Sequence, residues 1–338
     1  MPPDAQNPKR HGSSQIPFQI PLVIAHRGAS GDRPENTLAS FAHAIDLGAD
    51  YLELDVMPTR DGVLIVCHDN ELSATTDITH QPEFTHRKTT KRMEGHLLTG
   101  WFTEDFTYAD IQRLRVRERF ACRNQAFNGR FGIPTLEEVI QLVKQKTAQT
   151  RKTAGLYLEI KHPSYFRAVG LPIEPMVLDC LTRWGYTGSD APVILESFEP
   201  QSLRTLRQHT DLPISQLLGK AHEHAADSNQ PYGSFVTTDG LRAIADYANG
   251  ISPAKGLIVL PHLDDATELG LPTSLIADAH AQGLWVHAYT FRSEPQFLHP
   301  AYRGNPQVEY QQFFELGVDG VFSDAPDQAI RARGQRFY

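Results

Sequence analysis

The chain has 338 residues, of which 40% are hydrophobic and 21% charged, and its formal net charge is -8 at pH 7. This length suits either two ordinary domains or one large α/β barrel. The negative charge argues against non-specific binding to nucleic acid or to a membrane surface, because both require basic patches. The sequence contains no stretch of 18 or more apolar residues, so we expect no stable insertion into a membrane.

The amino terminus, residues 1–20, contains basic residues but lacks the apolar segment of a signal peptide, so it predicts a disordered tail. As written, the sequence therefore predicts a cytoplasmic protein. If the chain is the trimmed form of an exported precursor, the prediction becomes a periplasmic or secreted protein.

The first predicted strand is the apolar run 22–25, which is too short for a helix and stops at a His-Arg-Gly sequence. His26 and Arg27 therefore lie at the carboxyl end of this strand. After a loop, helical spacing begins at Thr37 and stops at Gly48, which are suitable start and stop residues for a helix. Strand, loop and helix form the first half of a βαβ unit.

The second predicted strand, 51–56, alternates in polarity and therefore places Glu53 and Asp55 on one face. Two neighbouring carboxylates repel each other unless a positive charge lies between them. A divalent cation is the usual solution, because hard cations take several oxygen ligands from Asp and Glu. A carboxylate pair on a strand is by itself more often a solvated edge, but here His and Arg residues fall at strand ends in the same short segment.

An Asp-Gly sequence at 61–62 is a strong hairpin signal, and it is followed by a strand at 63–68. If these two residues form the turn, Asp55 lies opposite His68 on the same face of the hairpin, whereas a three-residue turn would break this pairing. Cys67 would then point to the opposite face, and we interpret it as a packed core residue.

Residues 70–132 lose this regularity and predict a functional insertion, because so long a loop is unusual in a compact domain. One short helix is expected after Thr107. The histidines of this segment, His80, His86 and His96, are interpreted as solvated surface residues.

Strands and helices alternate through the rest of the chain. The further predicted strands cover 156–161, 193–198, 214–218, 257–260, 285–291 and 320–323. The predicted helices cover 134–146, 174–184, 200–208, 239–249, 273–282 and 309–316.

The strand count gives eight βα units, so the predicted fold is α/β: a TIM (β/α)8 barrel with a β-hairpin after strand 2. We expect the insertion at about 70–132 to cover the carboxyl end of the barrel. The predicted organisation is a single domain over 21–330 and a tail at 331–338.

Active sites of TIM barrels lie at the carboxyl ends of the strands, which directs attention to four further residues. Glu159 and Lys161 share one face of the strand at 156–161. Tyr289 is a candidate for an aromatic side chain that faces the substrate. Asp324 follows the last strand and either closes the rim of the site or caps the next helix.

These residues suit the cleavage of a phosphodiester. His26 and His68 titrate near neutral pH and can act as base and acid. Arg27 presents a planar donor fork for phosphate oxygens, and Lys161 adds a point charge. An all-carboxylate ligand set indicates Ca²⁺ or Mg²⁺ rather than zinc, and we favour Ca²⁺.

The segment 22–70 resembles the amino-terminal signature of the glycerophosphodiester phosphodiesterases, with the sequences IAHRG, PENTL and ELDV, a DG turn and a strand that ends in HD. The later stretches GWFTEDFT and F-G-x-P-T-L-E-E-V are similar to the longer bacterial-type members. The stretches FRSEPQFLHP, EYQQFFELGVDGVFSD and the final APD resemble the family again. The resemblance therefore covers roughly residues 22–330.

The resemblance implies His26 and His68 as catalytic acid and base, and Glu53, Asp55 and Glu159 as ligands of one divalent cation. It also implies hydrolysis of a small-molecule substrate, a glycerophosphodiester such as glycerophosphocholine or glycerophosphoethanolamine, to sn-glycerol 3-phosphate and an alcohol. The course that the resemblance implies is attack by the glycerol 2-hydroxyl to give a cyclic phosphate, which water then opens.

Two alternatives stay open. A related barrel phospholipase would act on lysophospholipid or phosphatidylinositol and should expose an apolar rim. A non-catalytic binding or adhesin protein would tolerate the loss of a histidine or a ligand. The head-group alcohol, the identity of the metal, the oligomeric state and the roles of Glu35 and Asn36 are not fixed by the sequence.

Overall fold

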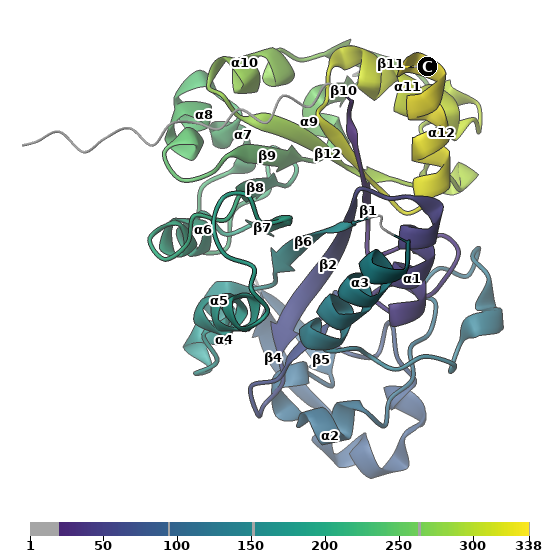
Figure 1. Ribbon diagram of the computed structural model, residues 1–338, viewed down its shortest axis with the longest axis vertical. Helices are drawn as coiled ribbons and strands as arrows, with labels where there is room; N and C mark the ends of the chain where they lie inside the picture. The colour runs from purple at the N-terminus through teal and green to yellow at the C-terminus, as the bar shows by residue number, and fades with distance from the viewer. Residues whose placement is uncertain (1–19, 94, 151–152, 263–264, 338) are drawn as a thin grey trace, which may run out of the picture.

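The protein is described by a computed structural model that covers residues 20–93, 95–150, 153–262 and 265–337 (Figure 1). The predicted disordered tail at 1–20 lies outside the described residues except for its last residue. A closed barrel of parallel strands forms the centre of the structure, and the predicted TIM barrel is confirmed. Its strands are β1 (Leu22–Ala25), β2 (Tyr51–Pro58), β6 (Gly155–Ile160), β7 (Val193–Ser197), β8 (Ile214–Leu218), β9 (Gly250–Pro253), β12 (Trp285–Phe291) and β13 (Gly320–Ser323).

Neighbouring strands follow the order β1, β13, β12, β9, β8, β7, β6, β2, and the pairing of β1 with β2 closes the ring. Helices surround this ring in Figure 1. Those that follow barrel strands are α1 (Leu38–Leu47), α3 (Leu136–Thr150), α5 (Ile173–Arg183), α6 (Pro200–Arg207), α8 (Thr238–Ala245), α10 (Leu275–Ala281), α11 (Pro306–Leu316) and α12 (Pro326–Phe337). Shorter helices are α2 (Tyr108–Ile111), α4 (Pro163–Ala168), α7 (Tyr232–Phe235) and α9 (Lys255–Ile258).

Alternation along the strands creates two layers of core. On β2, Leu52 and Leu54 belong to the large apolar cluster between barrel and helices. Tyr51 points to the other side, where it packs with Tyr157 and Phe322 inside the barrel. Glu53 and Asp55 follow Tyr51 on this inner face, as the sequence predicts.

The first helix begins and ends where the sequence predicts. The Thr37 side chain accepts a hydrogen bond from the backbone of Ser40, whose side chain in turn accepts one from the Thr37 backbone, so the two form a capping box. Gly48 ends the helix in the left-handed conformation at φ 94. These caps fix the loop that carries Glu35 and Asn36.

The predicted hairpin register is wrong by one residue. Strand β3 (Leu64–Val66) runs antiparallel to β2, with Val56 paired to Val66. The Cys67 backbone N–H therefore donates to the Asp55 carbonyl, at 3.0 Å, and Asp55 lies opposite Cys67 rather than His68. The turn has three residues because the Thr59 backbone N–H donates to the Val63 carbonyl and the chain between them turns at 60–62.

Cys67 is buried, and burial raises the pKa of its thiol to about 12, so its interpretation as a core residue is confirmed. His68 lies beyond the end of β3. Its side chain reaches the inner site without following the alternation of the strand.

The strand predicted at 257–260 is also wrong, since β9 occupies Gly250–Pro253. A Cβ atom at Gly250 would lie 2.0 Å from the indole nitrogen of Trp285, so only glycine leaves room for that ring inside the barrel. The apolar run at 257–260 instead forms the end of α9 and part of the short strand β10 (Val259–Pro261), which pairs with β11 (Leu269–Pro272). Short apolar runs of this kind do not distinguish a strand from a buried helical turn.

The predicted tail at 331–338 is wrong as far as the structure describes it, because α12 continues to Phe337. Ala332 is buried against the barrel. The Arg333 guanidinium donates to the Pro21 carbonyl at 2.9 Å and to Asp50 at 2.5 Å. These contacts hold the last helix against the start of β1.

The insertion is more regular than predicted. It contains a hairpin of β4 (Thr89–Met93) and β5 (His96–Gly100), and the short helix α2 begins after Thr107 as expected. Its own apolar cluster includes Phe84, Trp101 and Phe106, together with Met57 from the end of β2. Figure 1 shows it at the end of the barrel toward which β2 runs.

Candidate active site

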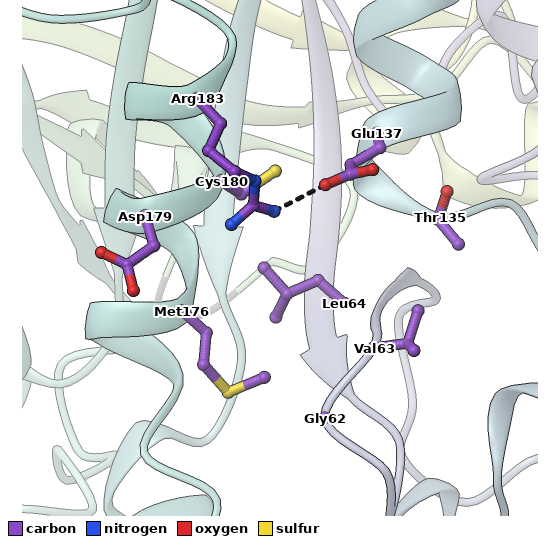
Figure 2. A pocket seen from close by; sticks show the side chains of 9 residues that line it. All are labelled: Gly62, Val63, Leu64, Thr135, Glu137, Met176, Asp179, Cys180 and Arg183. Atoms are coloured by element: carbon purple, nitrogen blue, oxygen red, sulfur yellow. Dashed lines mark hydrogen bonds and ion pairs between the residues drawn. The ribbon is translucent and has the colours of Figure 1, made fainter.

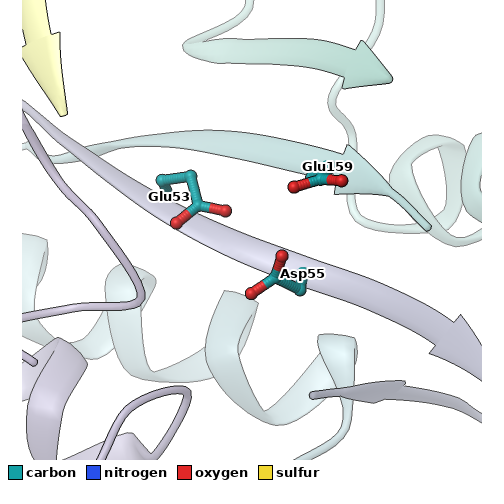
Figure 3. A group of neighbouring side chains, drawn as sticks. All are labelled: Glu53, Asp55 and Glu159. Atoms are coloured by element: carbon teal, nitrogen blue, oxygen red, sulfur yellow. The ribbon is translucent and has the colours of Figure 1, made fainter. Parts of the chain in front are cut away.

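Three buried carboxylates meet at the carboxyl ends of two neighbouring strands. Glu53 and Asp55 come from β2 and Glu159 from β6, and the strand register pairs Asp55 with Glu159. One oxygen from each lies within 4.8 Å of the others, and Figure 3 shows the three groups turned toward one another. The sequence therefore predicted the members of this carboxylate triad.

Two cations partly compensate the triad. The Arg27 Nε atom lies 3.2 Å from an Asp55 oxygen, and the Arg27 backbone N–H donates to Glu53 at 2.8 Å. Lys161 Nζ lies 2.9 Å from Glu159 and 3.6 Å from Asp55. The left-handed turn that aims the Arg27 N–H at Glu53 continues through Gly28, where a Cβ atom would lie 2.5 Å from the Ser40 hydroxyl oxygen.

The triad still carries more negative charge than its surroundings favour. Burial and the neighbouring Asp55 raise the pKa of Glu53 well above its usual value. Burial also raises the pKa of Glu159, to about 7. Burial alone would raise the pKa of Asp55 as well, but Arg27 and other nearby positive groups hold it well below its usual value.

One atom of the triad has an unused bonding position. Asp55 Oδ2 accepts a hydrogen bond from Asn36 at 2.8 Å. Asp55 Oδ1 is buried and accepts no hydrogen bond from any residue that the structure describes. A buried carboxylate oxygen without a donor, beside two further carboxylates, fits a site for a hard divalent cation.

The first imidazole is held by Asp324, which the sequence predicted either to close the rim of the site or to cap the next helix. His26 lies at the end of β1, and its Nδ1 donates to Asp324 at 2.6 Å. Arg123 and Arg292 bind the second oxygen of Asp324, at 2.5 and 3.0 Å. Although burial opposes the charge of Asp324, His26 and the two arginines hold its pKa far below its usual value.

The second imidazole has a similar arrangement. The Nδ1 atom of His68 donates to Asp69 at 2.6 Å, and Arg119 binds the other Asp69 oxygen at 2.9 Å. Burial, with Arg27 and Lys161, lowers the pKa of His68 to about 4. In both imidazoles the bonded Nδ1 leaves Nε2 for other partners.

A cavity of about 380 Å³, the central cavity, joins these groups. The predicted site residues that line it are His26, Arg27, Glu53, His68, Glu159 and Tyr289. Residues that the sequence analysis did not single out also line it: Arg119, Phe120, Glu196, Phe198, Leu217, Arg292 and Phe322. Asp55 is fully buried and does not line this cavity, and Lys161 lines an adjoining cavity.

That adjoining cavity, the side cavity, has a volume of about 700 Å³ and shares His68, Glu159 and Phe198 with the central cavity. The predicted surface histidine His96 is exposed and lines it. The other two, His80 and His86, are exposed as predicted.

Tyr289 faces the central cavity from β12, as predicted. Its hydroxyl donates to the Leu218 carbonyl at 2.9 Å, and its ring meets Phe198 and Phe322 edge to face. Alternation along β12 would place Phe291 on the same face, but it stacks on Tyr310 in the outer layer, because the β12–β13 pairing shifts register between Ala288 and Phe291.

Glu35 and Asn36 support the site. Glu35 binds Arg27 at 3.1 Å and Arg119 at 2.7 Å, whereas Asn36 binds Asp55. Helix capping falls to Thr37. Both residues therefore orient the groups around the triad.

A separate cavity of about 350 Å³ lies between α5, α3 and the turn after β2 (Figure 2). Arg183 and Glu137 form an ion pair of 2.6 Å across it. It contains none of the predicted site residues. Among the described residues, no helix combines the length and apolarity needed to cross a bilayer.

A parallel barrel with carboxylates and imidazoles gathered at the carboxyl ends of its strands defines the protein as a TIM-barrel enzyme. The sequence model of the Glycerophosphoryl diester phosphodiesterase family matches residues 26–328. The chain belongs to this family.

Relatives match nearly the whole chain. A glycerophosphodiester phosphodiesterase of Arabidopsis thaliana, GDPD6, is 36% identical over 317 residues, covering 90% of this chain and 83% of the relative. A glycerophosphodiester phosphodiesterase of Haemophilus influenzae is 28% identical over 341 residues, covering 91% of this chain and 88% of the relative.

Solved structures share the fold. A putative glycerophosphoryl diester phosphodiesterase of Silicibacter pomeroyi has a TM-score of 0.65 at 26% identity and covers 96% of this chain and 95% of its own. A phosphodiesterase of Oleispira antarctica in complex with the product sn-glycerol-3-phosphate has a TM-score of 0.64 at 22% identity, and the match covers 93% of this chain and 96% of that structure.

Proposed function

We propose that the protein hydrolyses glycerophosphodiesters, such as glycerophosphocholine or glycerophosphoethanolamine, to sn-glycerol 3-phosphate and an alcohol. The observation that carries this proposal is the meeting of His26, His68 and the carboxylate triad around one buried cavity. Family membership supports it, as do the relatives named for this activity.

The phosphodiester anion would bind among positive groups. Arg27 lines the central cavity, and the carboxylates beside it keep its pKa above the usual value despite burial, so it stays charged. Arg119 and Arg292 line the same cavity. Lys161, beside Glu159, adds charge from the side cavity, and Tyr289 offers an aromatic surface to the substrate.

Glu53, Asp55 and Glu159 would hold one divalent cation, and we favour Ca²⁺ over Mg²⁺ because Ca²⁺ accepts a wider range of oxygen-ligand geometries. When bound, the cation would neutralise charge on the phosphoryl oxygens. Arg27, Lys161 and Asn36 orient the three ligands through the contacts described above.

The two imidazoles divide the proton transfers. One Nε2 accepts the proton of the attacking glycerol 2-hydroxyl while the other protonates the leaving alcohol, which gives a cyclic phosphate. Water then opens the ring with the two roles reversed. Burial lowers both pKa values, so the imidazole that acts as base begins neutral. The imidazole that acts as acid must enter the step with a proton on Nε2, and Asp324 and Asp69 stabilise the protonated forms of His26 and His68.

A second candidate, hydrolysis of lysophospholipid or phosphatidylinositol, is favoured by one observation. Leu97 and Leu98 are 66% and 41% exposed on β5, the strand that begins at the cavity-lining His96. Such side chains at the mouth of a site could contact lipid.

A comparison of substrates tests both candidates. We expect the purified protein, supplied with Ca²⁺, to release sn-glycerol 3-phosphate from glycerophosphocholine. Faster cleavage of lysophospholipid or phosphatidylinositol vesicles than of glycerophosphocholine would contradict the first proposal. The variant Leu97→Ser/Leu98→Ser should leave glycerophosphocholine hydrolysis unchanged under either candidate and would lower vesicle hydrolysis under the second.

A further inference from the structure

Glu196 is a buried carboxylate of the central cavity to which the proposed mechanism gives no role. It lies on β7, where the strand register places it beside Glu159 of β6 and Ser215 of β8. Alternation turns it to the inside of the barrel with Ile194, and its side chain lines the cavity at 1% exposure.

One oxygen of this carboxylate lacks a partner. The Oε2 atom accepts no hydrogen bond from any described residue, although it is buried. Such a group costs free energy in the folded protein unless something in the site uses it. The three oxygens that lie within 4.8 Å of one another come from Glu53, Asp55 and Glu159, so Glu196 stands outside the triad.

We infer that Glu196 binds the terminal hydroxyl of the substrate's glycerol group and thereby selects glycerol diesters over diesters that lack this hydroxyl. The inference rests on the proposed function. The attacking 2-hydroxyl must lie at the imidazoles and the triad, and the terminal hydroxyl extends beyond it. Glu196 lies on β7, one strand beyond Glu159 of the triad, and neighbouring strands are usually about 4.8 Å apart.

The walls around Glu196 suit the carbon atoms of glycerol. Phe198, two residues further along the chain, and Leu217 on β8 both line the cavity. Glu196 adds a polar contact below these two apolar side chains. This arrangement rejects an analogue that leaves the polar group unpaired.

The test compares two substrates with the same leaving group. One is the 4-nitrophenyl diester of sn-glycerol 3-phosphate. The other is the 4-nitrophenyl diester of 1,2-propanediol 1-phosphate, which keeps the 2-hydroxyl but has a methyl group in place of the terminal hydroxymethyl group. The measured quantity is the ratio of kcat/KM for the first substrate to that for the second.

The wild-type ratio should be about 10 to 100, the usual effect of leaving a buried polar group without its hydrogen-bond partner. We expect Glu196→Leu to bring the ratio to within about threefold of 1, whereas Glu196→Gln, which keeps an acceptor oxygen, should retain a ratio of several-fold. Glu309→Gln removes another buried carboxylate with an unpartnered oxygen, on α11, and should leave the ratio unchanged.

A wild-type ratio near 1 would overturn the inference without any variant, as would an unchanged ratio in Glu196→Leu. It would also be overturned if Glu196→Gln raised the Ca²⁺ concentration needed for half-maximal activity, because Glu196 would then be a metal ligand. Failure of the wild type to cleave either diester would instead contradict the proposed function.

Discussion

Each proposed acid/base imidazole is oriented through its Nδ1 atom by a carboxylate, and arginines fix that carboxylate. Asp324 and Asp69 play this part for His26 and His68. The pairing fixes the tautomer and leaves Nε2 as the nitrogen that exchanges protons.

Removing either imidazole should stop turnover while the fold remains. We expect His26→Ala and His68→Ala each to lower kcat by about 10² to 10⁴, the usual contribution of general acid/base catalysis. His80→Ala, at an exposed position of the insertion, is the matched control. Circular dichroism checks the fold, and near-normal kcat in either site variant would refute the assigned role.

Asp324 should act through His26. We expect Asp324→Asn to lower kcat at least tenfold with little change in KM. The carboxylate accepts the Nδ1 hydrogen of His26 both before and after the proton transfer at Nε2, and the neutral amide does not hold the imidazole in this way. Asp324 also raises the pKa of His26, so the variant's pH profile should shift to lower pH. An unchanged profile and kcat would show that the contact has no catalytic effect.

Sequence reasoning located the residues that share one continuous segment. His26, Arg27, Glu53 and Asp55 all follow from strand ends and alternation. Asp324 was noticed but its role was open. Arg119 and Arg123 come from the insertion, where no periodicity exists to show which side chains return to the barrel.

At the scale of elements, the parallel register of β2 and β6 places Asp55 beside Glu159. Two strands from distant parts of the chain thus build one cluster of oxygens. Replacing a ligand should weaken cation binding rather than the fold.

We expect Glu53→Gln and Asp55→Asn to raise the Ca²⁺ concentration needed for half-maximal activity, by tenfold or more, since each removes one charge from the ligand set. Glu137→Gln on α3, far from the triad, serves as the control. Titration of activity with Ca²⁺ provides the measurement, and an unaltered metal requirement would break the ligand assignment.

A histidine inside β12 makes stability depend on pH. Burial lowers the pKa of His287 to about 4, below the unfolded value of 6.5. The unfolded chain therefore binds the proton more readily, and stability that is present above pH 6.5 is lost as the pH falls toward 4.

Between pH 7 and pH 5 this histidine should remove about 2 kcal/mol from the free energy of unfolding. Urea unfolding of the wild type and of His287→Gln at the two pH values provides the measurement. The fall in unfolding free energy from pH 7 to pH 5 should be smaller in the variant by about 2 kcal/mol. Equal losses in the two proteins would mean that His287 does not titrate as described.

Errors in the prediction of elements have local causes. The Asp-Gly signal was read as a two-residue turn, but Asp61 accepts hydrogen bonds from the Thr59 hydroxyl and the Tyr108 backbone, contacts that help hold a three-residue turn. The short strand β9 has only four residues, with Gly250 first and Pro253 last, and so shows no strand pattern. Its position is set by Trp285 and the neighbouring strands, which the sequence does not reveal.

For the whole molecule, the count of βα units predicted the barrel although one counted strand, at 257–260, was misplaced. The other buried parallel strands and the amphipathic helices leave periodic signals. The insertion is different. Arg119 and Arg123 tie it to Asp69, Glu35 and Asp324, so it forms one wall of the site. These long-range ion pairs depend on the folded barrel and could not be predicted locally.

The central claim is that the carboxylate triad and the two imidazoles act together on a glycerophosphodiester. The most direct measurement is the release of sn-glycerol 3-phosphate from glycerophosphocholine by the purified protein, after chelation and again after addition of Ca²⁺ or Mg²⁺. We predict that chelation abolishes the release and that Ca²⁺ restores it at lower concentration than Mg²⁺. Full activity after chelation, or no release with either ion, would contradict the account.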